Sequence, residues 1–307
     1  MAETLRGGVI GAGVFGGYHA NQYAKLPGVV LSAVLDTHPE RAAKVAMPLG
    51  GRGFADLPEF LSAVDVVTVA SPATFHADHA LAALAAGKHV YIEKPIATSV
   101  ADGEKVRAAA VANGLVVACG HQERVSFQAM GLLDIPEQPL LLEALRHGPP
   151  SDRSRDVSAV LDLMIHDIDL ALMISASDPV TAEGHGKRSY DGVWDIARSE
   201  VTFEDGFTAI FDVSREAPER KRTMRIVYPS GEVEIDFMAR TYRNTTPFAL
   251  QADLAGTPAG TDPLGVSVEG FLKAVRGEAP RPIVTAEEAI RALDLALAVE
   301  QALADPD

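Results

Sequence analysis

Short runs of apolar residues alternate with longer amphipathic stretches through the first 120 residues of the chain. The runs are rich in β-branched residues and are bounded by Gly, Pro or Asp, which is typical of buried strands. They fall at residues 8–10, 29–35, 64–70, 89–92 and 115–118. The stretches between them predict helices at residues 18–25, 39–45, 57–61, 77–86 and 100–113. Because strands that alternate with helices pair in parallel through right-handed crossovers, residues 1–120 are expected to form a doubly wound α/β sheet.

The pattern changes after about residue 120. A strongly apolar helix is predicted over residues 158–175, and strand-like segments follow at 180–187, 196–203, 207–213, 224–227 and 233–237. Gly206 and Gly231 stand between pairs of these segments, where glycine supplies the positive φ of a hairpin turn. Residues 121–307 are therefore expected to form an α+β domain on a large, mostly antiparallel open sheet. Residues 256–265 are expected to be a surface loop, and two closing helices are predicted at 267–276 and 286–303.

Composition and charge narrow the class of partner. The 307 residues carry 27 Lys and Arg against 42 Asp and Glu, a formal net charge of −15, which disfavours nucleic acid and anionic membrane surfaces. The single cysteine, Cys119, can form neither an intrachain disulfide nor a thiolate zinc cluster. The first residues do not read as a signal peptide, and no apolar run reaches the roughly 20 residues that span a bilayer. We expect a cytoplasmic protein that acts on small molecules or proteins.

A glycine-rich segment, Gly11-Ala12-Gly13-Val14-Phe15-Gly16, follows the first predicted strand and opens a helix. Missing side chains let the chain turn tightly and let a pyrophosphate approach the N–H groups at the positive end of the helix. Asp36 ends the second predicted strand, 20 residues beyond Gly16, where a carboxylate hydrogen-bonds ribose hydroxyls. Because this carboxylate repels a 2′-phosphate and no Lys or Arg follows until Arg41, the pattern predicts NAD rather than NADP.

Lys94 lies with Glu93 and Pro95 at the carboxyl end of the strand at 89–92, which is where ligands bind in an open α/β sheet. A lysine there can stabilise the negative charge that develops on a hydroxyl oxygen as hydride leaves. A solvated lysine in a loop is the alternative. Ser71-Pro72 ends the preceding strand and His76 follows, where it could cap, pack or touch a cofactor.

Three polar side chains share one face of the apolar helix predicted at 158–175, namely Asp162, His166 and Asp169. A buried, unpaired carboxylate costs several kcal/mol, so these groups need each other, water or a ligand. An imidazole steered by carboxylates is suited to act as a general base toward a hydroxyl. A satisfied buried His–Asp pair and a metal site are the alternatives. No metal is expected, because neither a cysteine nor a second clustered histidine supports it.

Together these motifs resemble the glucose–fructose oxidoreductase, inositol dehydrogenase and rhizopine-catabolism family. The likeness covers essentially the whole chain and rests on the glycine segment with His19, Ser71-Pro72 with His76, Gly87-Lys88-His89-Val90 leading to Glu93-Lys94-Pro95, and Asp162 to His166 with Asp169.

The resemblance implies a Rossmann domain that binds a nicotinamide cofactor, and a C-terminal sheet that commonly mediates homodimers or homotetramers. It implies that Lys94 and His166 are the catalytic pair, with Asp162 as their partner in substrate binding. The implied cofactor-binding residues are Gly11, Gly13, Val14, Phe15, Gly16, Asp36, Ser71, Pro72, His76, Glu93, Lys94 and Arg124.

A narrower likeness concerns Arg146-His147-Gly148-Pro149 and the segment from Asp156 to Asp169. They resemble the subgroup that oxidises the 3-hydroxyl of UDP-N-acetylglucosamine or its uronic acid, although Val125 and Phe127 replace the Phe and Pro usual there. We therefore expect NAD-dependent oxidation of a pyranose hydroxyl, most specifically C3 of a nucleotide sugar. A free sugar or a polyol such as inositol is the alternative substrate, and a non-catalytic NAD-binding regulator is the alternative class.

Two groups of basic residues stand out in this acidic chain. Arg146, Arg153 and Arg155 fall within ten residues just before the polar helix, where guanidinium groups could clamp a pyrophosphate or form a solvated loop. The second group is expected to span a hairpin connection, with a ligand role as the alternative, and comprises Arg215, Arg220, Lys221, Arg222 and Arg225.

Overall fold

A computed structural model describes residues 4–151, 155–188 and 192–304. The chain divides into two compact units. The first unit comprises Met1–Gln122 and Leu264–Ile290, and the second comprises Glu123–Pro263 and Arg291–Asp307. From the sequence we expected residues 121–307 to form one domain, whereas the structure returns the segment 264–290 to the first unit.

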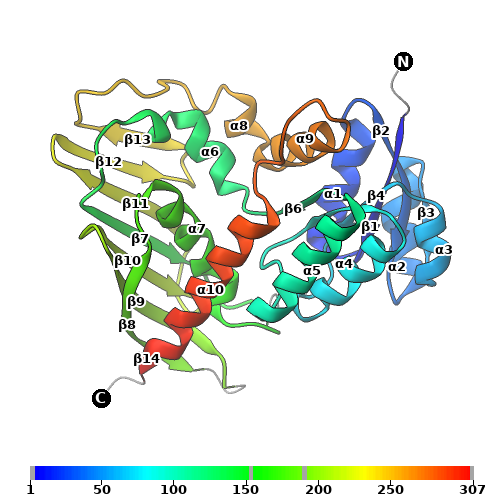
Figure 1. The fold of residues 1–307 in the computed structure, drawn as a ribbon, viewed down its shortest axis with the longest axis horizontal. Helices are drawn as coiled ribbons and strands as arrows, with labels where there is room; N and C mark the ends of the chain where they lie inside the picture. The colour runs from blue at the N-terminus through cyan, green and yellow to red at the C-terminus, as the bar shows by residue number, and fades with distance from the viewer. Residues whose placement is uncertain (1–3, 152–154, 189–191, 305–307) are drawn as a thin grey trace. The chain divides into compact units, whose positions relative to one another are not determined.

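The first unit is built on six parallel strands in the order β3-β2-β1-β4-β5-β6, the order of a Rossmann sheet (Figure 1). This confirms the expected doubly wound sheet. The strands are β1 Leu5–Ile10, β2 Val29–Leu35, β3 Arg52–Phe54, β4 Val66–Val69, β5 His89–Ile92 and β6 Val117–Cys119. The helices are α1 Val14–Lys25, α2 Pro39–Ala46, α3 Leu57–Ser62, α4 His76–Ala85, α5 Val100–Asn113 and α9 Pro263–Val275, with 3₁₀ turns at Met47–Leu49 and Ala73–Phe75.

Helix α9 explains why the chain returns to the first unit. Phe271 is fully buried and packs with Val9, Tyr23 and Tyr91 in one hydrophobic core. The rings of Phe271 and Tyr91 meet edge to face, and the Tyr91 hydroxyl lies 2.9 Å from Ser267 Oγ. Each contact joins residues more than 170 positions apart, so this packing could not be recognised from local periodicity.

The second unit holds an eight-stranded sheet in the order β13-β12-β11-β7-β10-β9-β8-β14 (Figure 1). Only the β7–β10 and β8–β14 pairs are parallel, so the expected mostly antiparallel sheet is confirmed. Gly206 and Gly231, with φ of 87° and 157°, stand at the two expected hairpins. The strands are β7 Leu141–His147, β8 Pro179–Arg188, β9 Trp194–Phe203, β10 Thr208–Ser214, β11 Lys221–Tyr228, β12 Gly231–Asp236, β13 Thr241–Asn244 and β14 Leu303–Ala304.

The helix expected at 158–175 consists of a π-helical turn, Val160–Met164, followed by α7, Ile165–Ile174, and both pack against β10. The remaining helical segments are α6 Glu123–Met130, a 3₁₀ turn at Leu132–Asp134, α8 Pro258–Thr261 and α10 Ala286–Ala302, whose first residues belong to the first unit. Within the described ranges, no helix combines the length and the apolar character that crossing a bilayer requires.

Two expectations about the second unit were wrong or incomplete. The loop expected at 256–265 contains α8, because Thr257 caps a helix that Pro258 starts; the Thr257 Oγ1 accepts the Gly260 N–H at 3.1 Å. Strand β7 and helix α6 were not predicted. In β7 the inward positions are Leu142, Ala144 and Arg146, and a buried arginine breaks the apolar alternation by which a strand is recognised.

Candidate active site

The glycine turn after β1 leaves room for a dinucleotide phosphate. Gly11 has a φ of 100°, and a Cβ there would lie 2.6 Å from the Ala70 carbonyl oxygen. A Cβ at Gly16 would overlap the Gly11 carbonyl oxygen, so both positions require glycine. Gly13 directly precedes α1, and a Cβ there would have no neighbour within 4 Å, so the space beside this residue is open at the start of the helix. These residues fit a bound pyrophosphate.

Asp36 stands at the end of β2 and is fixed by the glycine turn itself. Its Oδ2 accepts the Ala12 backbone N–H at 2.9 Å, and its Oδ1 accepts the His38 N–H at 2.9 Å. Partial burial alone would raise the pKa of Asp36, but these two hydrogen bonds bring it below the ordinary value. The carboxylate is therefore ionised at neutral pH, and each oxygen retains a lone pair for a ribose hydroxyl.

His76 joins the chain segments that follow β4 and β5. Its ring is buried, with Nδ1 2.7 Å from the Pro95 carbonyl oxygen and Nε2 2.9 Å from the Ser71 carbonyl oxygen. Burial lowers the pKa of His76 despite these two carbonyls. Through its contacts with Pro95 and Ser71, the imidazole links the segment that follows Lys94 to the end of β4. His76 thus supports the loop that carries the lysine.

Glu93, directly before Lys94, is buried and held by two side chains. Its Oε1 lies 2.6 Å from His19 Nε2 and accepts the Gln122 side-chain N–H at 2.9 Å. Burial alone would raise the pKa of Glu93, but the contact with His19 brings it below its ordinary value. A Cβ at Gly120 would lie 2.8 Å from Glu93 Oε2, so the glycine makes space for this carboxylate. The partly buried Lys94 thus follows an anchored residue.

In the second unit, His166 lies at the start of α7 beside a carboxylate that was not predicted from the sequence. His166 Nδ1 is 2.7 Å from Glu123 Oε2, with both side chains largely buried. Glu123 Oε1 accepts the Arg146 Nη1–H at 2.8 Å, and Arg146 donates two further hydrogen bonds to Asp167, at 2.8 and 3.0 Å. We call His166, Glu123, Arg146 and Asp167 the buried charge network.

The network controls the ionisation of its members. Burial alone would raise the pKa of Glu123, but the charges of His166 and Arg146 hold it well below its ordinary value. Burial likewise opposes the charge of Arg146, yet Asp167 and Glu123 raise its pKa above the ordinary value. Glu123 and Arg146 are therefore both charged at neutral pH, and the imidazole faces a negative charge.

This arrangement revises the role expected for Arg146. A pyrophosphate clamp needs an accessible guanidinium, but Arg146 is 2% exposed and its fork is bonded to Asp167 and Glu123. Of the two other expected clamp residues, Arg153 lies outside the described residues, and Arg155 is exposed and donates to the Ser151 carbonyl at 3.3 Å. Arg146 is thus a structural partner of the carboxylates.

Asp162 lies in the π-helical turn and pairs with Arg215, whose Nη2 is 3.1 Å from Asp162 Oδ2. Arg215 also donates to the carbonyls of Val157 and Ser158, at 2.9 and 3.0 Å, and so ties the strand end to the start of the helix. This role of Arg215 was not predicted, because the residue belongs to the basic group that was expected at a hairpin connection. Within the second unit, Asp162 and His166 are therefore held by different partners.

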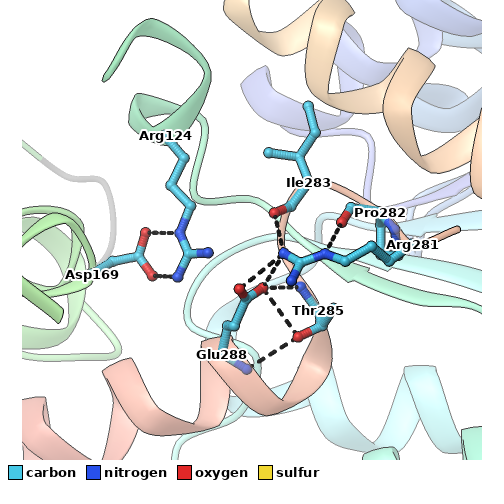
Figure 2. A network of polar contacts seen from close by, with 7 residues as sticks. All are labelled: Arg124, Asp169, Arg281, Pro282, Ile283, Thr285 and Glu288. Carbon is cyan, nitrogen blue, oxygen red and sulfur yellow. Dashed lines mark hydrogen bonds and ion pairs between the residues drawn. The ribbon is translucent and has the colours of Figure 1, made fainter. Parts of the chain in front are cut away.

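Arg124 and Asp169 form a buried, bidentate ion pair, with both N···O distances at 2.7 Å (Figure 2). The pair explains how Asp169 is satisfied on an apolar helix, and it fixes α6 to α7. Figure 2 also shows, in the first unit, Arg281 bonded to Glu288 at the N-terminus of α10. Proximity of Arg124 to a nicotinamide stays a prediction. Among the described residues, no group of His, Cys, Asp and Glu is arranged to hold a metal ion.

Comparison with known proteins agrees with this geometry. The description "Oxidoreductase family, NAD-binding Rossmann fold" matches residues 5–121, and the GFO/IDH/MocA C-terminal domain matches residues 143–234. Both parts of the chain thus match a family of NAD-binding oxidoreductases, and its named members are dehydrogenases that act on sugar hydroxyl groups. The chain belongs to the GFO/IDH/MocA oxidoreductase family.

Individual relatives are named sugar and polyol dehydrogenases. The chain is 34% identical to the UDP-N-acetylglucosamine 3-dehydrogenase of Acidithiobacillus ferrooxidans, over 90% of each chain. A solved structure of that enzyme matches with a TM-score of 0.89 at 33% identity, covering 99% of this chain and 98% of the other. The scyllo-inositol 2-dehydrogenase (NAD(+)) of Bacillus subtilis is 26% identical over 71% of this chain and 69% of its own.

The charge network makes a prediction about pH dependence. The negative Glu123 favours a protonated ring at His166, so Glu123→Gln should make the ring harder to protonate. We expect the acidic limb of the kcat/KM profile to move to lower pH and the plateau to fall roughly tenfold or more. Glu143→Gln, on the opposite face of the sheet, is the control and should leave the limb in place. An unshifted limb in Glu123→Gln would mean that this carboxylate has a purely structural role.

Proposed function

We propose that the protein oxidises a secondary hydroxyl of a pyranose to a ketone with NAD, and that the substrate is a nucleotide sugar such as UDP-N-acetylglucosamine, oxidised at C3. The observation that carries the proposal is His166 on α7, held by Glu123 inside the buried charge network. The similarity to the Acidithiobacillus ferrooxidans enzyme over 90% of each chain supports the choice of sugar.

His166 is assigned as the general base. With Nδ1 directed at Glu123, Nε2 is the nitrogen that takes the hydroxyl proton, and the Glu123 carboxylate stabilises the imidazolium that forms. Lys94 stabilises the negative charge that develops on the sugar oxygen. Asp162, partly neutralised by Arg215, accepts a hydrogen bond from a neighbouring sugar hydroxyl. NAD, when bound at the glycine turn and Asp36, supplies the hydride acceptor at C4 of its nicotinamide.

A free polyol is the second candidate substrate, because inositol dehydrogenases are also among the relatives. A regulator that binds NAD without turnover is the remaining class. It is disfavoured because an imidazole held by a buried carboxylate is suited to proton transfer, whereas cofactor binding alone does not require such a pair.

The proposed chemistry is tested by mixing protein, NAD and UDP-N-acetylglucosamine and following the absorbance of reduced cofactor, with scyllo-inositol in parallel. We expect turnover of the nucleotide sugar, and a loss of about 10²- to 10⁴-fold in kcat for Lys94→Ala and for His166→Ala. NAD affinity should survive in His166→Ala. The exposed His185→Ala is the control variant and should keep full activity. Full activity in either catalytic variant would contradict the mechanism, and NAD binding without turnover of any sugar would favour the regulator.

The ionised carboxylate of Asp36 generates a prediction about cofactor choice. It repels a 2′-phosphate, so kcat/KM should be at least about tenfold higher with NAD than with NADP. Asp36→Ser should lower the ratio of kcat/KM with NAD to kcat/KM with NADP, because it weakens the binding of NAD and removes the repulsion that disfavours NADP. A lower KM for NADP than for NAD in the unaltered protein would overturn the assignment.

We also propose that the protein is a homodimer or homotetramer assembled through the eight-stranded sheet. The face opposite the buried charge network carries a depression of about 610 Å³, lined by paired charges together with Leu145, Ile210 and Tyr242. Multi-angle light scattering should give a mass of two or four chains, and Ile210→Arg should reduce it. A monomer mass for the unaltered protein would remove this proposal.

A further inference from the structure

Arg222 lies on the same face of the sheet as the buried charge network. In the β7–β11 pair it stands opposite Arg146, and Met224 and Ile226 stand opposite Ala144 and Leu142. Met224 and Ile226 are buried, and side chains alternate along a strand, so Arg222 shares their face. Residues directly opposite in an antiparallel pair are neighbours, with Cβ atoms about 5 Å apart. Arg222 is thus next to Arg146, which in turn is hydrogen-bonded to Glu123.

Three other arginines of the second unit have carboxylate partners. Arg146 is bonded to Asp167 and Glu123, and Arg215 is paired with Asp162. Arg225, on the opposite face of the same strand, lies 2.7 Å from Glu143 and 2.8 Å from Glu232.

Arg222 differs from all of them. In the part of the chain that the structure describes, its guanidinium makes no hydrogen bond or ion pair, although the residue is partly buried. Burial and the positive charge of Arg146 lower the pKa of Arg222, while Glu123 and Asp167 offset this effect only in part because Arg146 engages them. A partly desolvated guanidinium without a counter-charge is costly, and an anion that arrives there is stabilised.

We propose that Arg222 binds an anionic oxygen group of the substrate and so selects charged sugars over neutral ones. This inference rests on the proposed function and adds to it the residue that recognises the substrate's charge. The planar guanidinium suits a phosphate of the nucleotide diphosphate or the carboxylate of a uronic sugar, both of which accept two parallel N–H bonds. Arg220, which lies near Gly148 at the end of β7, adds positive charge to the same end of the sheet.

The same observations argue against a neutral polyol as the preferred substrate. A polyol hydroxyl can accept one hydrogen bond from Arg222 but leaves its charge uncompensated. The anion-binding role that was expected for Arg146 is thereby assigned to Arg222, its neighbour across the β7–β11 ladder. The Arg146 N–H groups are hydrogen-bonded to Asp167 and Glu123, whereas the Arg222 guanidinium is not bonded to a carboxylate of the described residues.

The test compares Arg222→Gln with Arg225→Gln, two arginines on opposite faces of one strand. For UDP-N-acetylglucosamine we expect KM to rise about 10- to 100-fold in Arg222→Gln, with kcat and the KM for NAD little changed. Arg225→Gln should leave all three constants unchanged. Arg222→Lys keeps the positive charge but loses the planar guanidinium, so its KM for UDP-N-acetylglucosamine should lie between those of the other two variants. This variant also tests the proposal if Arg222→Gln fails to fold.

Calorimetric titration without turnover separates the two anions and the two proposals. If Arg222 binds a phosphate, UDP alone should bind the unaltered protein and should bind Arg222→Gln at least tenfold more weakly. If Arg222 binds a carboxylate, glucuronate should show this difference in affinity instead. UDP binding that depends on Arg222 in a protein that oxidises no nucleotide sugar would retain the anion site and remove the proposed function. Turnover of the nucleotide sugar with equal KM in Arg222→Gln and Arg225→Gln, together with UDP and glucuronate affinities that are the same in Arg222→Gln and the unaltered protein, would overturn the role of Arg222 and leave the function intact.

Discussion

The second unit depends on one buried ion pair, between Arg146 and Glu123. Arg146 balances two carboxylates, so Glu123, Asp167 and Arg146 together carry one net negative charge while the His166 ring is neutral. The set becomes neutral when the ring takes a proton. Removing Arg146 would leave two carboxylates buried without a counter-charge, which is costly. The same contacts therefore join α6, β7 and α7 and favour proton uptake at His166.

A similar arrangement recurs in the first unit. There the buried Glu93 is held by His19 and Gln122, and Lys94 follows it in the chain. In both units a residue proposed for chemistry stands beside a carboxylate that is itself anchored inside the fold. The residues proposed for chemistry are thus supported by packed, charged neighbours, which position a side chain more precisely than a flexible loop does.

Local patterns were sufficient for most of residues 1–122, and insufficient for strand β3, for the return of α9 to the first unit and for part of the second unit. The strands at 29–35 and 89–92 and the helix at 100–113 were predicted with their observed bounds, because apolar periodicity and a cap such as Ser99 act within a few residues. The glycine turn and Asp36 were likewise readable, since their spacing is imposed by the ligand geometry. Glu123 was missed because its partner His166 is 43 residues away, and only the fold brings them together. The different environments of Arg146 and Arg222 were not predicted for the same reason: whether an arginine is paired depends on contacts that strand register creates.

The chain passes between the two units three times, after Gln122, Pro263 and Ile290. A substrate-binding unit from a relative could therefore not be exchanged by joining two halves end to end. Such an exchange would have to replace residues 123–263 as an insertion and also match the part of α10 that follows Ile290. Recombination within this family is thus constrained to several simultaneous crossover points, and a single truncation yields neither unit whole.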